Sequence, residues 1–127
     1  MHEPAREWLE ASLNGTTRVG LPWWSRAAFV RIATNARAYP DPLTPAEAAL
    51  QVAEWLDAPR AWLAEPTANF QQVFLDLVRR HSVRGPLVTD VQLAALAIDH
   101  GVAVASSDAD FARFREVTWF NPLDSHG

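Results

Sequence analysis

Apolar residues recur at helical spacing in several stretches of this chain, and short apolar runs lie between those stretches. A repeat of three to four residues predicts a helix with one buried face, whereas a short unbroken apolar run favours a buried strand. The predicted helices cover residues 3–13, 23–34, 45–57, 68–81 and 90–100, and a further helical turn covers 108–114. The predicted strands cover residues 18–21, 61–64, 102–105 and 117–120.

Local signals mark the ends of several of these helices. The stretch Thr44-Pro45-Ala46-Glu47 combines an N-cap residue, a proline at the first helical position and the glutamate of a capping box. Thr89, with Gln92 three residues later, predicts a second capping box. Asn14-Gly15 and Gly101 are typical of left-handed caps at helix C-termini.

Helices that alternate with short buried strands predict an α/β fold with a parallel sheet covered on both sides, a three-layer α/β/α arrangement. The chain has 127 residues, which suits one domain of ordinary size. The sequence contains no internal repeat and no low-complexity linker. We therefore expect residues 1–127 to form a single domain.

Composition narrows the class of protein further. The chain is 49% hydrophobic and 20% charged, as soluble globular proteins are. It contains no apolar run of the ~20 residues that span a bilayer, and its polar N-terminus is not a secretory signal. We therefore expect a cytoplasmic protein with no membrane partner. Cysteine is absent, which excludes a disulfide framework, a thiolate metal site and a cysteine nucleophile.

Three aspartates are the main candidates for chemistry. Asp108 and Asp110 follow the predicted strand 102–105 by a few residues, and Asp90 opens the helix that leads into that strand. Ligands of parallel sheets bind beyond the carboxyl ends of the strands, and a helix packed antiparallel to its strand begins at the same edge. The three carboxylates should therefore lie together. Oxygen-only ligands suit Mg²⁺ or Mn²⁺, so this cluster predicts a divalent metal site.

Helix capping is an equally good explanation from the residues alone. Aspartates at a helix start stabilise it by ~0.3–1 kcal/mol, through a side-chain cap or through the helix dipole. The net charge of −4 also gives no overall basic field of the kind that attracts nucleic acid.

The C-terminal third of the chain resembles a known family. Residues 85–123 read GPLVTDVQLAALAIDHGVAVASSDADFARFREVTWFNPL. The motif D-x-x-L-A-A-L-A-x-x-H-G begins at Asp90, and S-x-D-x-D-F runs from Ser106 to Phe111. The closing motif F-x-x-x-x-W-x-N-P-L ends at Leu123. These motifs are similar to those of PIN-domain ribonuclease toxins of the VapC kind, and the upstream stretch GLPWWSRAAFVRIATNARAYPDPLTPAEA also resembles them.

This resemblance implies an activity, a cofactor and partners. The positions of Asp90 and Asp108 help to bind Mg²⁺ or Mn²⁺ in the family, Asp110 is a nearby auxiliary acid, and the hydroxyl of Ser106 orients the site. Toxins of this kind cut RNA, pair with a VapB-like antitoxin and usually form homodimers.

The chain departs from the family pattern in two places. PIN domains begin with a strand that carries an aspartate in a pattern like V-D-x-N, whereas this chain begins at Met1-His2-Glu3-Pro4. We therefore expect that the first strand of the sheet and one metal ligand are missing. Many relatives also carry an acidic residue at the position of Trp24, and no other carboxylate lies between Glu10 and Asp41.

Other polar and aromatic residues carry weaker expectations. Arg26 and Arg31 are candidates for contact with RNA phosphates, although solvated or ion-paired arginines on a helix face are the more frequent case. Trp8, Trp23 and Trp55 fall on helical stripes, which favours the core or a dimer surface over base stacking.

Three functions follow as hypotheses. The first is an Mg²⁺- or Mn²⁺-dependent endoribonuclease toxin of a type II toxin–antitoxin system. The second is a catalytically degenerate PIN-fold fragment that acts only in antitoxin binding or dimerisation, which the two departures motivate. The third is a DNA-directed nuclease or repair factor on the same fold.

Overall fold

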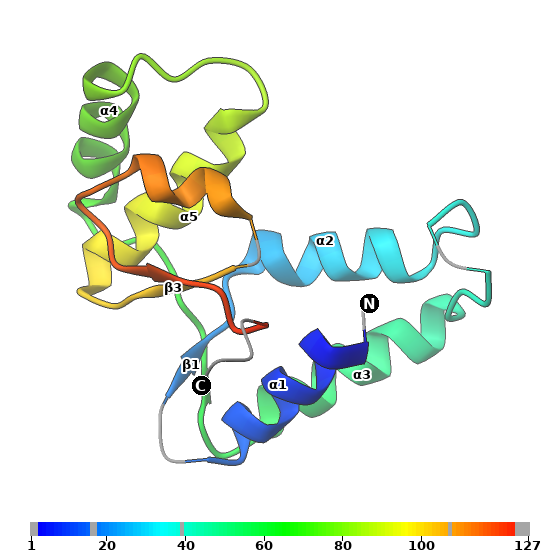
Figure 1. Ribbon diagram of the computed structural model, residues 1–127. Coiled ribbons are helices and arrows are strands. Elements are labelled where there is room, and N and C mark those ends of the chain that lie inside the picture. Colours follow the sequence, from blue (N-terminus) through cyan, green and yellow to red (C-terminus); the bar gives the residue numbers. More distant parts are fainter. Residues whose placement is uncertain (1–2, 16–17, 39, 107, 124–127) are drawn as a thin grey trace. The chain divides into compact units, whose positions relative to one another are not determined.

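The computed structural model describes residues 3–15, 18–38, 40–106 and 108–123, drawn as a ribbon in Figure 1. The chain divides into two compact units, a first unit of residues 1–65 and a second unit of residues 66–127. Throughout the described ranges, no helix is both long and apolar enough to cross a membrane.

The first unit holds three helices and one pair of strands among its described residues. Along the chain these are α1 (Glu3–Leu13), β1 (Val19–Gly20), α2 (Trp23–Ala33), α3 (Pro45–Asp57) and β2 (Ala61–Trp62). The strands β1 and β2 pair in parallel, with Val19 opposite Ala61 and Gly20 opposite Trp62. A Cβ on Gly20 would lie 3.0 Å from the Trp62 ring, so glycine permits this close approach.

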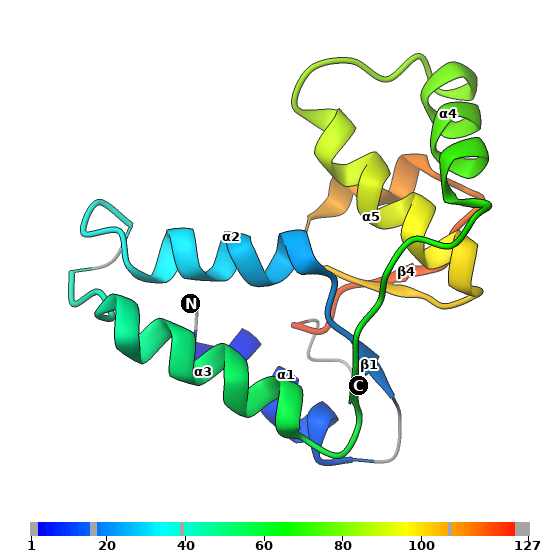
Figure 2. The same cartoon turned by 180° about the vertical axis from the view of Figure 1, so that it is seen from behind.

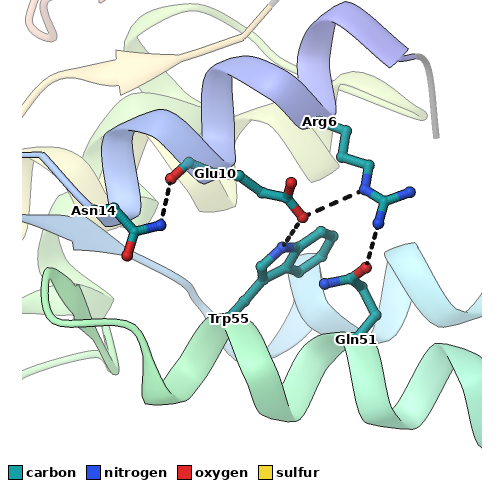
Figure 3. Close-up of polar contacts among 5 residues, drawn as sticks. All are labelled: Arg6, Glu10, Asn14, Gln51 and Trp55. Carbon is teal, nitrogen blue, oxygen red and sulfur yellow. Dashed lines mark hydrogen bonds and ion pairs between the residues drawn. The ribbon is translucent and has the colours of Figure 1, made fainter.

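Polar side chains connect α1 to α3, which lie side by side (Figures 1 and 3). The indole N–H of Trp55 donates to Glu10 at 3.3 Å, and the Arg6 guanidinium donates to Glu10 at 3.3 Å and to Gln51 at 3.0 Å. Trp55 is buried, and its ring meets that of Phe29 edge-on at 4.7 Å. Aromatic packing therefore joins α2 to α3, while this polar network joins α1 to α3.

Among its described residues, the second unit holds two α-helices, a 3₁₀ helix and a second pair of strands (Figures 1 and 2). In chain order these are α4 (Phe70–Arg80), α5 (Leu87–His100), β3 (Val104–Ala105), η1 (Ala109–Arg113) and β4 (Trp119–Phe120). The strands β3 and β4 are parallel, with Val104 opposite Trp119. The core lies between the helices and this pair, and its most buried large side chains are Phe114 and Val91.

The predicted α/β class with parallel strands is confirmed, and so are most element positions. The predicted capping box at Thr44 and Glu47 is present, with both reciprocal hydrogen bonds. Gly101 adopts φ = 67° and ends α5 as predicted. The amide of Val102 donates to Ala97 and that of Gly101 to Ile98, which is the pattern of a Schellman motif.

The predicted start of α5 is wrong. The helix begins at Leu87, Thr89 lies inside it, and its N-cap is Pro86 with no side-chain cap. Gly85, at φ = 65°, turns the chain into Pro86, whose fixed φ suits a helix start. Leu87 and Val88 pack against the core, so burial of apolar surface extends the helix past the polar signal.

One prediction of burial and one of backbone shape are also wrong. Strand β3 is not buried on both faces, because Val104 is buried but Ala105 is exposed. Trp23 is 67% exposed, so of the two expected places, the core or a dimer surface, the core is excluded. Asn14-Gly15 ends α1 without a left-handed residue, because the chain continues through ordinary turn bonds to Glu10 and Ser12.

Candidate metal centre

Asp90 lies in the first turn of α5, at the edge of the second unit's core. The apolar residues that follow it at helical spacing fix this helix in place, and Val91, Ala94 and Ala95 are fully buried. Asp90 itself is half-buried. Its carboxylate is not an N-cap, because α5 begins three residues earlier. A side-chain cap therefore does not account for this aspartate, although its charge in the first turn still interacts favourably with the helix dipole.

Asp108 lies at the start of the 3₁₀ helix η1, and Asp110 lies in the first turn of that helix. The Oδ1 of Asp108 accepts the backbone N–H of Asp110 at 2.8 Å, which makes Asp108 the N-cap of η1. This bond fixes the Asp108 side chain, and its second oxygen is outside that bond. Phe111 follows at once and is buried, so it anchors the acidic turn to the core.

Ser106 supports the same turn from the strand side. Its Oγ accepts the backbone N–H of Asp108 at 3.1 Å. Its carbonyl oxygen accepts the indole N–H of Trp119, on the neighbouring strand β4, at 2.9 Å. The turn is thus held at both ends, by Ser106 before Asp108 and by Phe111 after Asp110.

The structure brings the three predicted aspartates together. One carboxylate oxygen from each of Asp90, Asp108 and Asp110 can be chosen so that all lie within 4.8 Å of one another. Helix α5 contacts η1, which brings residues about twenty positions apart in the chain into one cluster. The predicted common location is therefore observed, and the metal role of these residues stays a prediction.

The charges of this cluster oppose one another. Burial raises the pKa of Asp90 above its ordinary value of 3.8, and the nearby charges of Asp108 and Asp110 raise it further. Arg113 acts in the opposite direction. Its guanidinium lies 3.9 Å from Asp110 and is largely exposed, so it offsets only a small part of the repulsion.

A hard divalent cation fits this donor set. Three carboxylates supply only oxygen ligands, which Mg²⁺ and Mn²⁺ prefer. A cation would also remove the mutual repulsion that raises the pKa of Asp90. Asp90, Asp108 and Asp110 each offer one carboxylate oxygen to such a cation.

The remaining sequence-predicted residues lie elsewhere in the chain. Arg26 and Arg31 belong to α2 in the first unit. Two further contributors were not predicted from the sequence, namely Trp119, which holds the Ser106 carbonyl, and Arg113 beside Asp110. The i, i+3 spacing of Asp110 and Arg113 in the sequence was the available signal for the second.

A family model and several known proteins match most of this sequence, and they agree on one family. The family model of the PIN domain matches residues 1–117. Ribonuclease VapC37 of Mycobacterium tuberculosis (strain ATCC 25618 / H37Rv) is 43% identical over 122 residues, covering 95% of this chain and 84% of that protein. Ribonuclease VapC33 of the same strain is 39% identical, covering 96% of this chain and 85% of its own length. Ribonuclease VapC43 is 34% identical, with coverage of 97% and 84%.

Proposed function

Because this chain belongs to the PIN-domain family, among the VapC proteins, we propose that it is a metal-dependent endoribonuclease toxin that hydrolyses RNA phosphodiester bonds. The observation that carries this proposal is the cluster of Asp90, Asp108 and Asp110, whose oxygens lie within 4.8 Å. The names of the relatives support RNA as the substrate. The family model crosses both compact units, which supports residues 1–127 acting as one domain.

In this proposal Asp90 and Asp108 hold the ion, Mg²⁺ or Mn²⁺, and Asp110 is auxiliary. Such an ion, when bound, supplies Lewis-acid stabilisation of the negative charge on the phosphodiester. The protein supplies the arrangement. The Asp110 amide fixes Asp108, Ser106 fixes the backbone of Asp108, and the buried face of α5 fixes Asp90. Side chains positioned in advance lose little freedom when they bind, which strengthens a site of few ligands.

The partners follow from the same family. We propose that the chain pairs with a VapB-like antitoxin, forms homodimers and acts on RNA in the cytoplasm. Names of the VapC kind, shared by all of the relatives reported above, support the antitoxin. Arg26 and Arg31 are proposed as weaker RNA contacts, on charge alone.

A second function is favoured by one specific residue. Trp24 stands where the resemblance places an acidic residue in many relatives, so this chain offers fewer carboxylates to the metal. A catalytically degenerate protein that only binds its antitoxin or its own second copy would tolerate that loss. The two functions differ in a single property, the turnover of RNA.

Cleavage of a labelled single-stranded RNA in Mn²⁺ distinguishes them. We expect the purified chain to cleave, EDTA to stop cleavage and renewed Mn²⁺ to restore it. Asp90→Asn should abolish turnover, and Asp57→Asn, at the exposed end of α3, is the matched control that should not. Full activity in Asp90→Asn would overturn the proposed site, and no turnover by the unaltered chain would favour the degenerate protein.

A further inference from the structure

The charge of the chain is unevenly distributed. The net charge is −4, yet residues 11–40 contain no aspartate or glutamate and four arginines. These are Arg18, Arg26, Arg31 and Arg37. None of the four forms an ion pair with a carboxylate in the part of the chain that the structure describes. A locally basic segment with uncompensated arginines favours a polyanionic ligand.

Helix α2 carries part of this segment on an exposed face. Trp23, Ala27 and Arg31 follow one another at a spacing of four residues, and all three are exposed. Residues at that spacing share one side of a helix, and Trp23 and Arg31 are about 12 Å apart along its axis. Trp23 also follows β1 closely, beyond the carboxyl end of a parallel pair, where α/β proteins bind ligands.

Trp23 is exposed to an unusual degree for its size. It is 67% accessible, whereas Trp55 on α3 is 7% accessible and packs in the core of the same unit. Its ring is nevertheless in contact with charge, because the Cζ of Arg26 lies 5.3 Å from the ring centroid. Arg26 is half-buried, and its Nε is buried without a hydrogen-bond partner among the described residues. The Arg26 side chain thus lies against the exposed ring in a cation–π contact.

An exposed indole beside arginines suits one class of ligand best. Aromatic rings bind single-stranded nucleic acid by stacking on unpaired bases, while arginines contact the adjacent phosphates. Leu50 on α3 is also 60% exposed, but its side chain has no π-face on which a base could stack. A protein segment could also cover Trp23. The positive charge of the neighbouring arginines favours RNA over such a segment, because every nucleotide of RNA carries a phosphate.

We propose that Trp23 stacks on an unpaired base of single-stranded RNA, with Arg26 and Arg31 at the neighbouring phosphates. This proposal rests on the proposed ribonuclease function and adds to it a residue that binds the substrate. Loss of the Trp23 side chain should weaken RNA binding and leave the rate of the chemical step unchanged, because Trp23 lies outside the carboxylate cluster.

Binding is measured without cleavage, so that this proposal is tested apart from the catalytic one. Fluorescence anisotropy of a short fluorescein-labelled RNA of mixed sequence is recorded with the full chain in EDTA. Trp23→Ala should raise Kd about 5- to 150-fold, the loss expected for one base stack. Trp23→Phe should keep most of the affinity, and Leu50→Ala is the matched control that should bind as the unaltered chain does.

Two further variants separate stacking from charge. Trp23→Leu keeps apolar bulk without a π-face and should bind as weakly as Trp23→Ala, which remains informative if the alanine variant folds poorly. Arg26→Gln should lower the slope of log Kd against log salt by about 0.7, the value for one phosphate on a single strand.

Two outcomes would overturn the proposal. One is binding by Trp23→Ala or Trp23→Leu equal to that of the unaltered chain. The other is RNA binding that is unaffected while a purified VapB-like antitoxin no longer binds the variant, which would assign this face to a protein. Mn²⁺-dependent cleavage by the unaltered chain would remain in either case, so the proposed function would stand without this residue.

Discussion

Replacing Asp90 by asparagine should stabilise the metal-free protein and remove most of its stabilisation by Mn²⁺. At 4.8 Å, the outer limit of the oxygen separations, each like-charge pair costs about 1 kcal/mol in a water-like dielectric. Asp90 forms two such pairs, with Asp108 and Asp110. The carboxylate charge that the substitution removes also interacts favourably with the α5 dipole, by about 0.3–1 kcal/mol, and with Arg113. Repulsion is the larger effect, so a net gain of about 1 kcal/mol remains.

Thermal unfolding followed by fluorescence measures this gain. About 1 kcal/mol corresponds to a rise in Tm of roughly 3–5 °C for a chain of this size in EDTA. Saturating Mn²⁺ should raise the Tm of the unaltered protein, because a ligand of the folded state stabilises it by about 2.7 kcal/mol at a hundred times its Kd. Asp90→Asn should show little of that rise. Asp90→Asn should therefore have the higher Tm in EDTA, and the unaltered protein should have the higher Tm in Mn²⁺.

The gain should also depend on pH with a definite sign. Because the pKa of Asp90 is raised in the folded protein, the folded state holds its proton more tightly than the unfolded state does. The destabilisation by Asp90 is therefore absent below its ordinary pKa of 3.8 and complete above the raised value. A lower Tm for Asp90→Asn in EDTA at neutral pH, together with an undiminished response to Mn²⁺, would refute this reasoning.

Three smaller predictions concern stability and are measured by urea unfolding. Burial raises the pKa of Glu116, but hydrogen bonds from Arg80 and His81 outweigh this effect and lower the pKa to about 2. Glu116→Gln should therefore lower the free energy of unfolding by about 1–3 kcal/mol at neutral pH. This loss of stability should vanish as the pH falls from 4.5 to 2. Gly101→Ala should cost about 1 kcal/mol, because φ is 67° although no atom lies within 4 Å of the added Cβ. Thr44→Ala should cost about 1 kcal/mol through loss of the cap, and no change would contradict the capping box.

Local signals in the sequence predicted the fold well at Thr44 and Gly101, where backbone chemistry alone decides the element. The proline and the reciprocal bonds at Thr44 need no tertiary partner, and neither does the left-handed glycine at Gly101. The start of α5 could not be predicted in this way. There the polar signal at Thr89 competes with burial of Leu87 and Val88, and the gain from burying two apolar side chains exceeds that of one cap.

Burial was harder to predict than position along the chain. Trp23 and Trp55 both lie on apolar helical stripes, and nothing in their spacing separates the exposed ring from the buried one. The difference arises from neighbours that are distant in sequence, since Trp55 contacts Phe29 and Glu10. For Trp23, the arginine three residues later was a local signal of a surface position.

The location of the aspartate cluster was predictable from topology, but its supporting bonds were not. Helix order and strand direction place Asp90 and Asp108 at one edge whatever the side-chain detail. The bond from Trp119 to the Ser106 carbonyl depends on the register of β3 and β4, which the sequence does not specify. Such register-dependent contacts appear only once the strands are paired.

Crystals of the protein grown with Mn²⁺ test the central claim most directly, through anomalous scattering of the bound ion. The account predicts a strong peak among the carboxylates of Asp90, Asp108 and Asp110, within coordination distance of Asp90 and Asp108, and its loss in crystals of Asp90→Asn. A protein that cleaves RNA in Mn²⁺ but holds the ion at other residues, with none at this cluster, would contradict it.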